Sequence, residues 1–280
     1  MSLRSRSEAM RHVVLVAVAA LFALPIYLAF VAATKTAPAL LRGVPLVPGG
    51  ELGHNLAQVL VHGLPGSPSV FSLMGNSAVM ALGIALGKLS LSVPAAYAVV
   101  FFRLRGRMAA FWLVFVTLML PVEVRFFPTY QVTVELGLLN NLGGVVVPLI
   151  ASATAVFLFR QFFMTFPLDL ADAARMDGIG PMRFLTRIVL PLSKPNLAAV
   201  FVIEFIYGWN QWLWPLLVTS NARNATVVMG MREMISSAQG FAVPQWDLVM
   251  AAALLAMVPP VVVVLVMQRW FVNGLTAGVN

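Results

Sequence analysis

The sequence predicts an all-α protein that crosses a membrane several times, and two observations carry this prediction. Of the 280 residues, 60% are hydrophobic and only 10% are charged, whereas a soluble domain carries roughly 25% charged residues. So little charge cannot cover a water-facing surface, which excludes a soluble globular enzyme and a disordered chain. The apolar residues also form six long runs without the alternation expected of membrane-spanning strands. We therefore expect helices, which satisfy their own backbone polar groups inside a bilayer.

Six spans are predicted because about 20 helical residues cross the roughly 30 Å of hydrocarbon in a bilayer. The predicted spans are Val13–Ala33, Phe71–Phe102, Met108–Tyr130, Leu142–Phe163, Leu197–Thr219 and Leu248–Met267. The apolar part of the third span ends at Val122. The first span follows basic residues, as a cleaved signal peptide would, but its apolar run of about 20 residues exceeds the 7–15 of a signal sequence. We expect a retained helix and a single membrane domain over residues 1–280.

The basic residues predict the orientation of these spans. With the N-terminus inside, twelve of the 18 Lys and Arg residues fall in inner segments, five fall in outer loops, and Lys88 lies within a span. Because cytoplasmic loops are enriched in Lys and Arg, both termini are expected in the cytoplasm. The net charge of +8 is therefore a topology signal spread along one membrane face. It does not form the basic patch that a nucleic-acid-binding protein needs.

The predicted cytoplasmic loop 167–195 has the chemistry of two helices joined by a turn. Asp169 and Asp172 lie near the start of the first helix, where carboxylates favour the helix dipole. Gly178 and Gly180 break this helix, and Pro181 suits the first turn of the next. The second helix has apolar residues at helical spacing, namely Phe184, Leu185, Ile188 and Val189. By composition alone, this loop is an amphipathic connector at the membrane surface.

One spacing pattern in this loop is more specific. Asp172, Ala173 and Ala174 are followed after three residues by Gly178, and after nine more by Ile188-x-Leu190-Pro191. This pattern resembles the EAA loop of ABC importer permeases, except that Asp172 replaces a Glu and shortens the reach by one methylene. The resemblance implies that this loop holds a coupling helix that docks on the ATPase. The implied coupling residues are Asp172, Ala173, Ala174, Asp177, Gly178, Ile188, Leu190 and Pro191.

The resemblance extends over nearly the whole chain, to the sugar-type permeases of the maltose-importer group. The segments that carry it are LFALPIYLAFVAAT (21–34), TLMLPVEVRFFPT (117–129), ASATAVFLFRQFFMT (151–165), FIYGWNQWLWPLL (205–217) and PPVVVVLVMQRWFVNGL (259–275). Within the group, the chain most resembles the second permease subunits of sn-glycerol-3-phosphate importers. This implies alternating-access import of sn-glycerol-3-phosphate or glycerophosphodiesters across the cytoplasmic (inner) membrane.

The same resemblance implies the partners of the chain. They are a homologous second permease, two copies of a cytoplasmic ATPase, an extracytoplasmic substrate-binding protein and membrane lipid, without nucleic acid. The sequence has no Gly-x4-Gly-Lys-Ser/Thr phosphate loop, so ATP and Mg are expected on the partner ATPase and no cofactor on this chain. The three histidines do not cluster with carboxylates at the spacing of metal ligands, so no metal site is predicted. No catalytic constellation is visible, and the chain is expected to be a permease and not an enzyme.

Charged residues inside a membrane are costly, so Lys88 and Glu204 are candidates for the substrate pathway. At 1.5 Å per residue, Lys88 lies roughly 15 Å and Glu204 roughly 10 Å from the inner ends of their spans. Their similar depths allow an ion pair between them. Either it only holds two helices together, or Lys88 faces the pathway and attracts a phosphate.

Further pathway candidates lie in the fifth span and beside the third. In the fifth span, helical spacing places Gln211 on the face of Glu204, with a neighbouring stripe of Tyr207, Asn210 and Trp214. The Trp residues there could equally form an interfacial belt. Glu123 and Arg125 follow the third span. Arg125 could attract an anionic substrate at an outer gate with Glu123 holding it, or both could simply be solvated.

Two alternatives to the phosphate importer stay open at this level. The first is an ABC importer permease for a neutral sugar. The second is a proton-coupled secondary transporter with Lys88 and Glu204 as the proton relay. Inverted repeats would favour the secondary transporter, and none is visible in the sequence.

Overall fold

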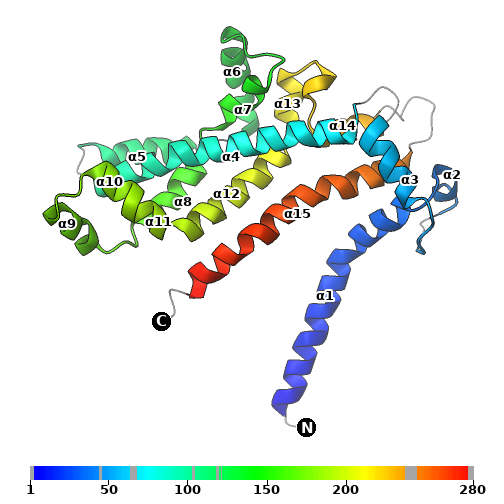
Figure 1. Ribbon diagram of the computed structural model, residues 1–280, viewed down its shortest axis with the longest axis horizontal. Helices are drawn as coiled ribbons and strands as arrows, with labels where there is room; N and C mark the ends of the chain where they lie inside the picture. The colour runs from blue at the N-terminus through cyan, green and yellow to red at the C-terminus, as the bar shows by residue number, and fades with distance from the viewer. Residues whose placement is uncertain are drawn as a thin grey trace. The chain divides into compact units, whose positions relative to one another are not determined.

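The computed structural model describes residues 3–43, 46–63, 68–102, 105–117, 120, 122–236 and 245–276. Within these ranges every secondary-structure element is a helix (Figure 1), which confirms the predicted all-α class. The chain divides into two compact units. Unit 1 comprises Met1–Met74 and Gly230–Val258, and unit 2 comprises Gly75–Met229 and Pro259–Asn280.

Unit 1 is organised around the C-terminal end of its first helix. Its own elements are α1 (Leu3–Ala33), α2 (Ala37–Leu40), α3 (Leu52–Ala57) and the π-helical turn η1 (Gln58–His62). Asn55 of α3 is buried, and its amide donates to the carbonyls of Ala33 and Lys35, both at 2.9 Å. The hydroxyl of Thr34 accepts from the amide of Gly49 at 2.7 Å. The two bonds from Asn55 satisfy carbonyls at the end of α1 that have no intrahelical partner.

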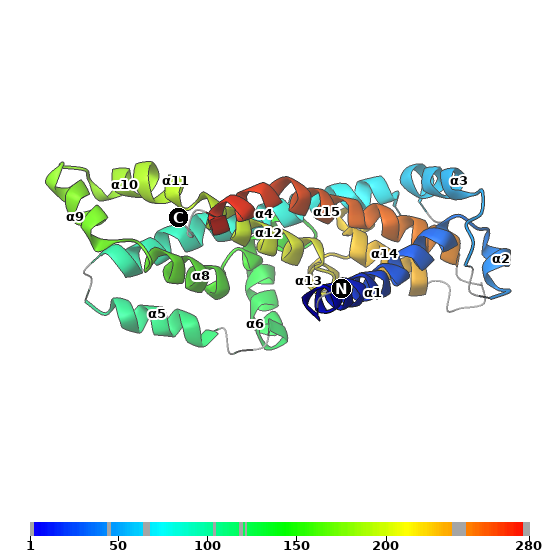
Figure 2. The same ribbon diagram turned by 90° about the horizontal axis from the view of Figure 1, so that it is seen from below.

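Three helices pass from one unit to the other, and the remaining elements belong to unit 2. The shared helices are α4 (Val70–Phe101), α14 (Val227–Ser236) and α15 (Trp246–Thr276). The unit 2 elements before residue 167 are α5 (Arg107–Val116), α6 (Val122–Glu135), α7 (Leu142–Val146), η3 (Val147–Leu149) and α8 (Ala153–Phe163). The unit 2 elements that begin after residue 193 are α12 (Lys194–Trp209), α13 (Leu213–Val218) and η5 (Ala222–Asn224). Helices α8 and α12 lie along the second half of α4 (Figures 1 and 2).

The coupling segment of unit 2, predicted as loop 167–195, is helical almost throughout. It comprises α9 (Leu168–Met176), α10 (Pro181–Phe184), the π-helical turn η4 (Leu185–Val189) and α11 (Leu190–Leu192). The predicted arrangement of one helix, a turn and a second helix is therefore confirmed, although the second helix is interrupted by the π-turn.

The predicted count of six spans is not confirmed among the described residues. Three helices are long and apolar enough to cross a membrane, at Met10–Ala33, Val70–Phe101 and Trp246–Trp270. Two bent helix pairs raise the number to five: Leu142–Leu149 with Ala153–Phe163, at 44°, and Pro181–Leu192 with Lys194–Trp209, at 78°. The third predicted span is divided between α5, which has ten residues, and α6.

Proline positions account for these breaks. Pro121 lies in the sequence between α5 and α6, and a proline removes a backbone donor and disfavours helix in the residue before it. Pro148 lies in η3, next to the 44° bend. The fifth predicted span ends as α12 at Trp209 and resumes at Leu213, which places Pro215 in the first turn of α13. A proline is tolerated in a first turn because its missing N–H has no intrahelical acceptor there.

The core of unit 2 has two apolar clusters. The first joins the coupling segment to three long helices through Val93, Ala96, Tyr97, Ala155, Phe159, Phe163, Ala171, Ala174, Phe184, Leu185, Val189 and Val200. The second joins α4, α7 and α13 through Met80, Ile84, Val145, Trp214 and Val218. The first cluster therefore connects the predicted ATPase-facing segment to the helices that hold the intramembrane charges.

A sharp corner separates the coupling segment from α12. The helical axes on its two sides differ by 78°, and Ser193 lies between them. The side chain of Ser193 is buried, and its hydroxyl donates to the carbonyl of Val189 at 2.5 Å. This bond ties the corner to the preceding π-turn.

Candidate functional site

Helix α9 ends in a Schellman motif built around Gly178. Gly178 has φ +69°, in the left-handed region, which glycine adopts without the steric penalty of other residues. The amide of Gly178 donates to the carbonyl of Arg175 at 3.1 Å, and the amide of Ile179 donates to that of Ala174 at 2.9 Å. The two bonds satisfy carbonyls at the helix end. The glycine of the EAA-like pattern thus fixes the length of α9 and the direction in which the chain leaves it.

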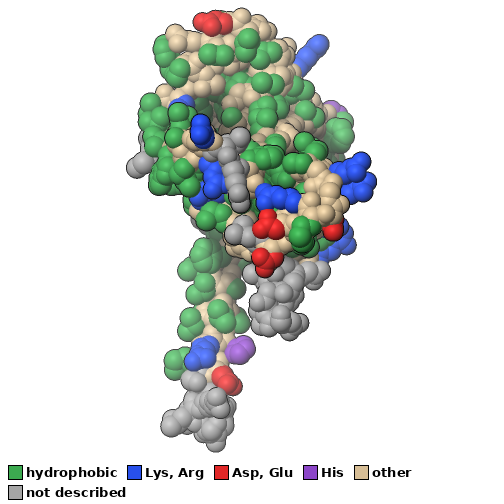
Figure 3. All heavy atoms as spheres, turned by 90° about the vertical axis from the view of Figure 1, so that its left-hand side faces the viewer, with side chains coloured by type: hydrophobic (Ala, Val, Ile, Leu, Met, Phe, Trp, Pro, Cys, Tyr) green, Lys and Arg blue, Asp and Glu red, His purple; other side chains and the backbone are tan. Residues whose placement is uncertain are grey.

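The faces of α9 divide the predicted coupling residues into an exposed and a buried group. Ala174 is buried with Ala171 in the first apolar cluster. The exposed members of the predicted set are Asp172, Ala173, Asp177, Gly178 and Pro191. Ile188 and Leu190 are half-buried against the same cluster. In Figure 3, where the α9 end faces the viewer, acidic and basic side chains lie close together on the surface.

Two further side chains on this surface were not predicted. Met176 is 84% exposed and Met182 is 70% exposed. Arg175 donates to the carboxylate of Asp172 at 2.6 Å, with both side chains more than half exposed. An exposed pair of this kind stabilises a helix by only about 0.3–0.5 kcal/mol. Together these residues form an exposed surface with methionines at its edges, which suits a protein partner.

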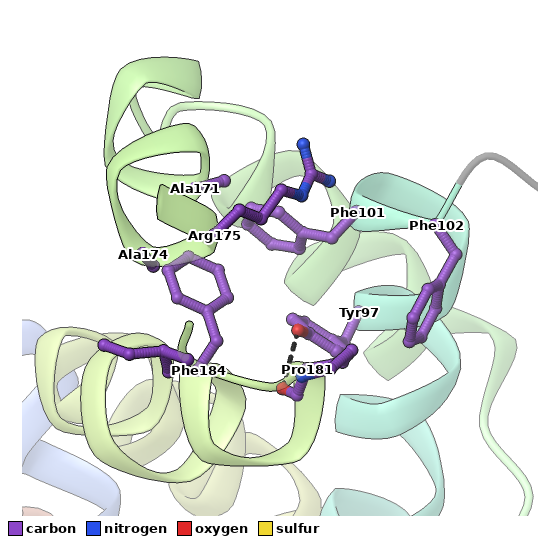
Figure 4. Close-up of a pocket in the computed structure, with 9 residues that line it drawn as sticks. Tyr97, Phe101, Phe102, Ala171, Ala174, Arg175, Pro181 and Phe184 are labelled. Carbon is purple, nitrogen blue, oxygen red and sulfur yellow. Dashed lines mark hydrogen bonds between the residues drawn. The ribbon is translucent and has the colours of Figure 1, made fainter. Parts of the chain in front are cut away.

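An aromatic pocket lies beneath α9 (Figure 4). Its volume is about 490 Å³, and it is lined by Tyr97, Phe101, Phe102, Ala171, Ala174, Arg175, Ile179, Pro181 and Phe184. The hydroxyl of Tyr97 donates to the carbonyl of Pro181 at 2.9 Å. The Phe184 ring lies 5.5 Å from that of Phe101, edge to face. Tyr97 therefore links α4 directly to the turn after α9. Sequence reasoning missed this residue because nothing distinguishes it from the apolar residues around it.

The Tyr97→Phe variant tests this link. It removes one hydrogen bond and keeps the ring, so we expect the complex to lose about 1 kcal/mol of stability. Thermal denaturation of the purified complex measures the loss. Tyr27→Phe is the matched control, since the Tyr27 hydroxyl donates to Leu46 at 2.8 Å at an exposed position. If both variants melt at the wild-type temperature, the Tyr97 bond does not stabilise the fold.

The predicted ion pair between Lys88 and Glu204 is present. The Lys88 ammonium donates to Glu204 Oε2 at 2.6 Å, with side chains 7% and 4% exposed. The hydroxyl of Ser152 donates to Glu204 Oε1 at 3.1 Å. The ammonium also lies 3.8 Å from the ring centre of Tyr207, within the range of a cation–π contact. Both charges therefore have more than one partner, as charges buried away from water require.

This ion pair borders a cavity of about 250 Å³ that also reaches Arg125. Its walls come from α4, α6, η3, α8 and α12. Its polar lining residues are Lys88, Arg125, Thr129, Ser152, Thr154, Glu204 and Tyr207. The structure thus brings together four of the predicted pathway residues: Lys88, Arg125, Glu204 and Tyr207. Ser152 was missed, although a serine just before an apolar helical run is a recognisable N-cap signal; its hydroxyl accepts from the amide of Ala155.

Three other predicted pathway residues, Asn210, Gln211 and Trp214, are not among the residues that line this cavity. Asn210 and Gln211 lie in the break between α12 and α13. Trp214 is fully buried, and its indole donates to the carbonyl of Gly144 at 3.1 Å. The side chain of Glu123 lies outside the described residues. A pathway role for these four residues stays a prediction.

Residues 82–277 match the family described as the binding-protein-dependent transport system inner membrane component. This match covers more than two thirds of the chain. The chain belongs to this family. It is therefore a permease subunit of an ABC transporter, located in the inner membrane and not itself catalytic.

Curated relatives match this family member over nearly its whole length. The sn-glycerol-3-phosphate transport system permease protein UgpE of Yersinia pestis is 53% identical over 266 residues, which are 94% of each chain. The proteins of the same name from Rhizobium meliloti and Brucella melitensis are 49% and 48% identical over 275 residues, which are 97% of each chain.

A solved structure supports the fold of this family member. A chain of a bacterial ABC transporter involved in the import of the acidic polysaccharide alginate superposes with a TM-score of 0.80, at 22% identity. The superposition covers 97% of this chain and 99% of the other. Membership of the family favours binding-protein-dependent transport over the proton-coupled alternative. Among the described residues, no three His, Cys, Asp or Glu side chains are grouped so that they could hold a metal ion.

Proposed function

We propose that this chain is a permease subunit of an ABC importer that moves sn-glycerol-3-phosphate, or glycerophosphodiesters, by alternating access. The observation that carries the proposal is the name of the relatives, which are 48–53% identical over 94–97% of both chains. The cavity chemistry supports it independently. Two cations, the buried Lys88 and the exposed Arg125, line one cavity together with the single carboxylate of Glu204, and this arrangement favours an anionic substrate over a neutral sugar.

In this proposal the coupling segment transmits ATP-driven movement into the membrane. Helix α9 docks on the ATPase through its exposed residues, from Asp172 to Gly178. Its buried face, with Ala171 and Ala174, packs on α4 and α8 through the first apolar cluster. A displacement of α9 therefore moves the long helices with it, because a close-packed interior transmits strain.

The same proposal assigns the partner subunits, the nucleotide site and the orientation of the transporter. The complex contains a second, homologous permease, two copies of the ATPase and an extracytoplasmic binding protein. ATP and Mg bind to the ATPase, and this chain holds no cofactor. Both termini lie in the cytoplasm, which places α9 on the side where ATP is available. Glu123, Asn210, Gln211 and Trp214 belong to the pathway or its gate.

Uptake by the reconstituted complex tests the function. We expect proteoliposomes that hold the full complex and its binding protein to accumulate radiolabelled sn-glycerol-3-phosphate when ATP is inside. Unlabelled glycerophosphodiester should compete, whereas maltose at the same concentration should not. Binding protein loaded with sn-glycerol-3-phosphate should stimulate the ATPase at least fivefold. Stimulation and uptake with maltose alone would replace the phosphate with a neutral sugar as the substrate.

A further inference from the structure

The buried ion pair is not explained by stability alone. Lys88 lies near the middle of α4, about 27 Å along the helix from Val70 and about 20 Å from Phe101. Charges at such depth are disfavoured. Replacing a buried ion pair with apolar residues of similar size is often neutral or stabilising. A pair whose only task is to hold α4 against α12 could therefore be replaced by apolar residues without loss.

Among the residues that the structure describes, the charges around the cavity do not balance. They are two cations, the buried Lys88 and the exposed Arg125, and one carboxylate, Glu204. These residues come from three different helices, α4, α6 and α12. A phosphate monoester carries a charge of about −1.5 to −2 near neutral pH. Such a group would change the net charge of this lining from +1 to between about −0.5 and −1, whereas a neutral sugar would leave the positive charge uncompensated.

The geometry at Lys88 leaves room for a third partner. An ammonium has three N–H donors. One donates to Glu204 Oε2, and the face of the Tyr207 ring lies 3.8 Å away. Glu204 is held from its other side, since Ser152 donates to Oε1 at 3.1 Å. A phosphate oxygen in the cavity can therefore reach Lys88 while Ser152 still holds the carboxylate.

We propose that Lys88 and Arg125 bind the phosphate of the substrate in this cavity, and that Glu204 is a resident carboxylate that competes with it for Lys88. When the substrate enters, Lys88 exchanges its hydrogen bond with Glu204 for one with the phosphate. When the substrate leaves, Lys88 pairs with Glu204 again, so that the substrate does not remain bound between two cations. This assignment rests on the proposed function and adds to it a binding site within this chain.

Direct binding and uptake together test the assignment. The Glu204→Gln variant keeps Lys88 charged and removes its competitor. We expect purified complex without binding protein to retain at least threefold more radiolabelled sn-glycerol-3-phosphate, displaceable by inorganic phosphate, while uptake falls at least tenfold. A merely structural pair predicts no gain in binding. Unchanged or weaker binding by Glu204→Gln would therefore overturn the competition between Glu204 and the phosphate for Lys88.

Two double variants separate the binding role from a structural role. Lys88→Met with Glu204→Leu keeps the volume and removes both charges, and Lys88→Glu with Glu204→Lys keeps the pair but moves the cation to α12. We expect both complexes to assemble and to lose uptake at least tenfold. Arg42→Met, which removes an exposed cation of unit 1, should keep wild-type uptake. Uptake within twofold of wild type by the first double variant would refute the site.

These outcomes are distinct from failure of the proposed function. If the wild-type complex does not accumulate sn-glycerol-3-phosphate, the proposed substrate is wrong and the assignment falls with it. If the wild type accumulates it and the charge-free double variant does so equally well, only the binding site is wrong. The exchange with Glu204 alone is wrong if the double variants lose uptake but Glu204→Gln shows no gain in binding.

Discussion

Gly178→Val is expected to reduce uptake at least tenfold while the permease still inserts into the membrane and the ATPase still hydrolyses ATP. Gly178 has φ +69°, and a β-branched residue in that region is a steric outlier. The strain is of order 1–3 kcal/mol, and the chain relieves it by changing how α9 ends. The helix then no longer presents its exposed face in register with the ATPase. Uptake and ATP hydrolysis, measured on the same proteoliposomes, report the loss of coupling.

Gly180→Val is the matched control. Gly180 lies two residues further along and has an ordinary φ of −65°. A Cβ added at either glycine meets nothing within 4 Å, so the two variants differ in backbone strain and not in packing. We expect Gly180→Val to keep uptake within about twofold of wild type. An equal loss of uptake in both variants would mean that uptake depends on the surface around these two glycines and not on the left-handed conformation of Gly178.

Lys88→Met alone is expected to destabilise the complex by about 3–5 kcal/mol, because it leaves the Glu204 carboxylate buried with only the Ser152 hydroxyl as a partner. The fraction of complex that survives a graded heat treatment, followed by size-exclusion chromatography, measures this loss. The double variant Lys88→Met with Glu204→Leu should recover most of the stability, since it leaves no charge behind.

The comparison between the single and double variants is a double-mutant cycle. A single variant as stable as wild type would mean that Glu204 becomes neutral or finds another partner at little cost. A double variant as unstable as the single one would mean that the pair itself holds α4 and α12 together. Arg42→Met should not change the melting behaviour, because its side chain is exposed.

Sequence reasoning predicted the long helices and the ion pair well, because both depend on simple arithmetic. Apolar runs of sufficient length predict the ends of the membrane-spanning parts of α1, α4 and α15 to within three residues, although α1 begins earlier and α15 ends later. The depths of Lys88 and Glu204 follow from the rise per residue once the span ends are known. Their pairing needed only that two buried opposite charges lie at similar depth, since isolated buried charges are unfavourable.

The breaks within the predicted spans explain most of the differences between the predicted site residues and those that the structure brings together. The expected common face of Glu204 and Gln211 assumes one continuous helix through the fifth span. Helix α12 ends at Trp209, so the helical spacing no longer places Gln211 above Glu204. The contributions of Ser152 and Tyr97 depend on how separate helices pack, and a single sequence does not contain that information. Gly178 was predicted as a helix breaker because its role is local.

The corner at Ser193 also has a mechanical consequence. Glu204 lies ten residues after Lys194, about 15 Å along α12 from that corner. Because the segment Pro181–Leu192 and helix α12 meet at 78°, a displacement along the axis of the first segment rotates α12 about the corner. A swing of about 10° displaces the carboxylate by roughly 2.6 Å at that radius. This displacement equals the length of its hydrogen bond with Lys88, so a rotation of this size directed away from α4 breaks that bond.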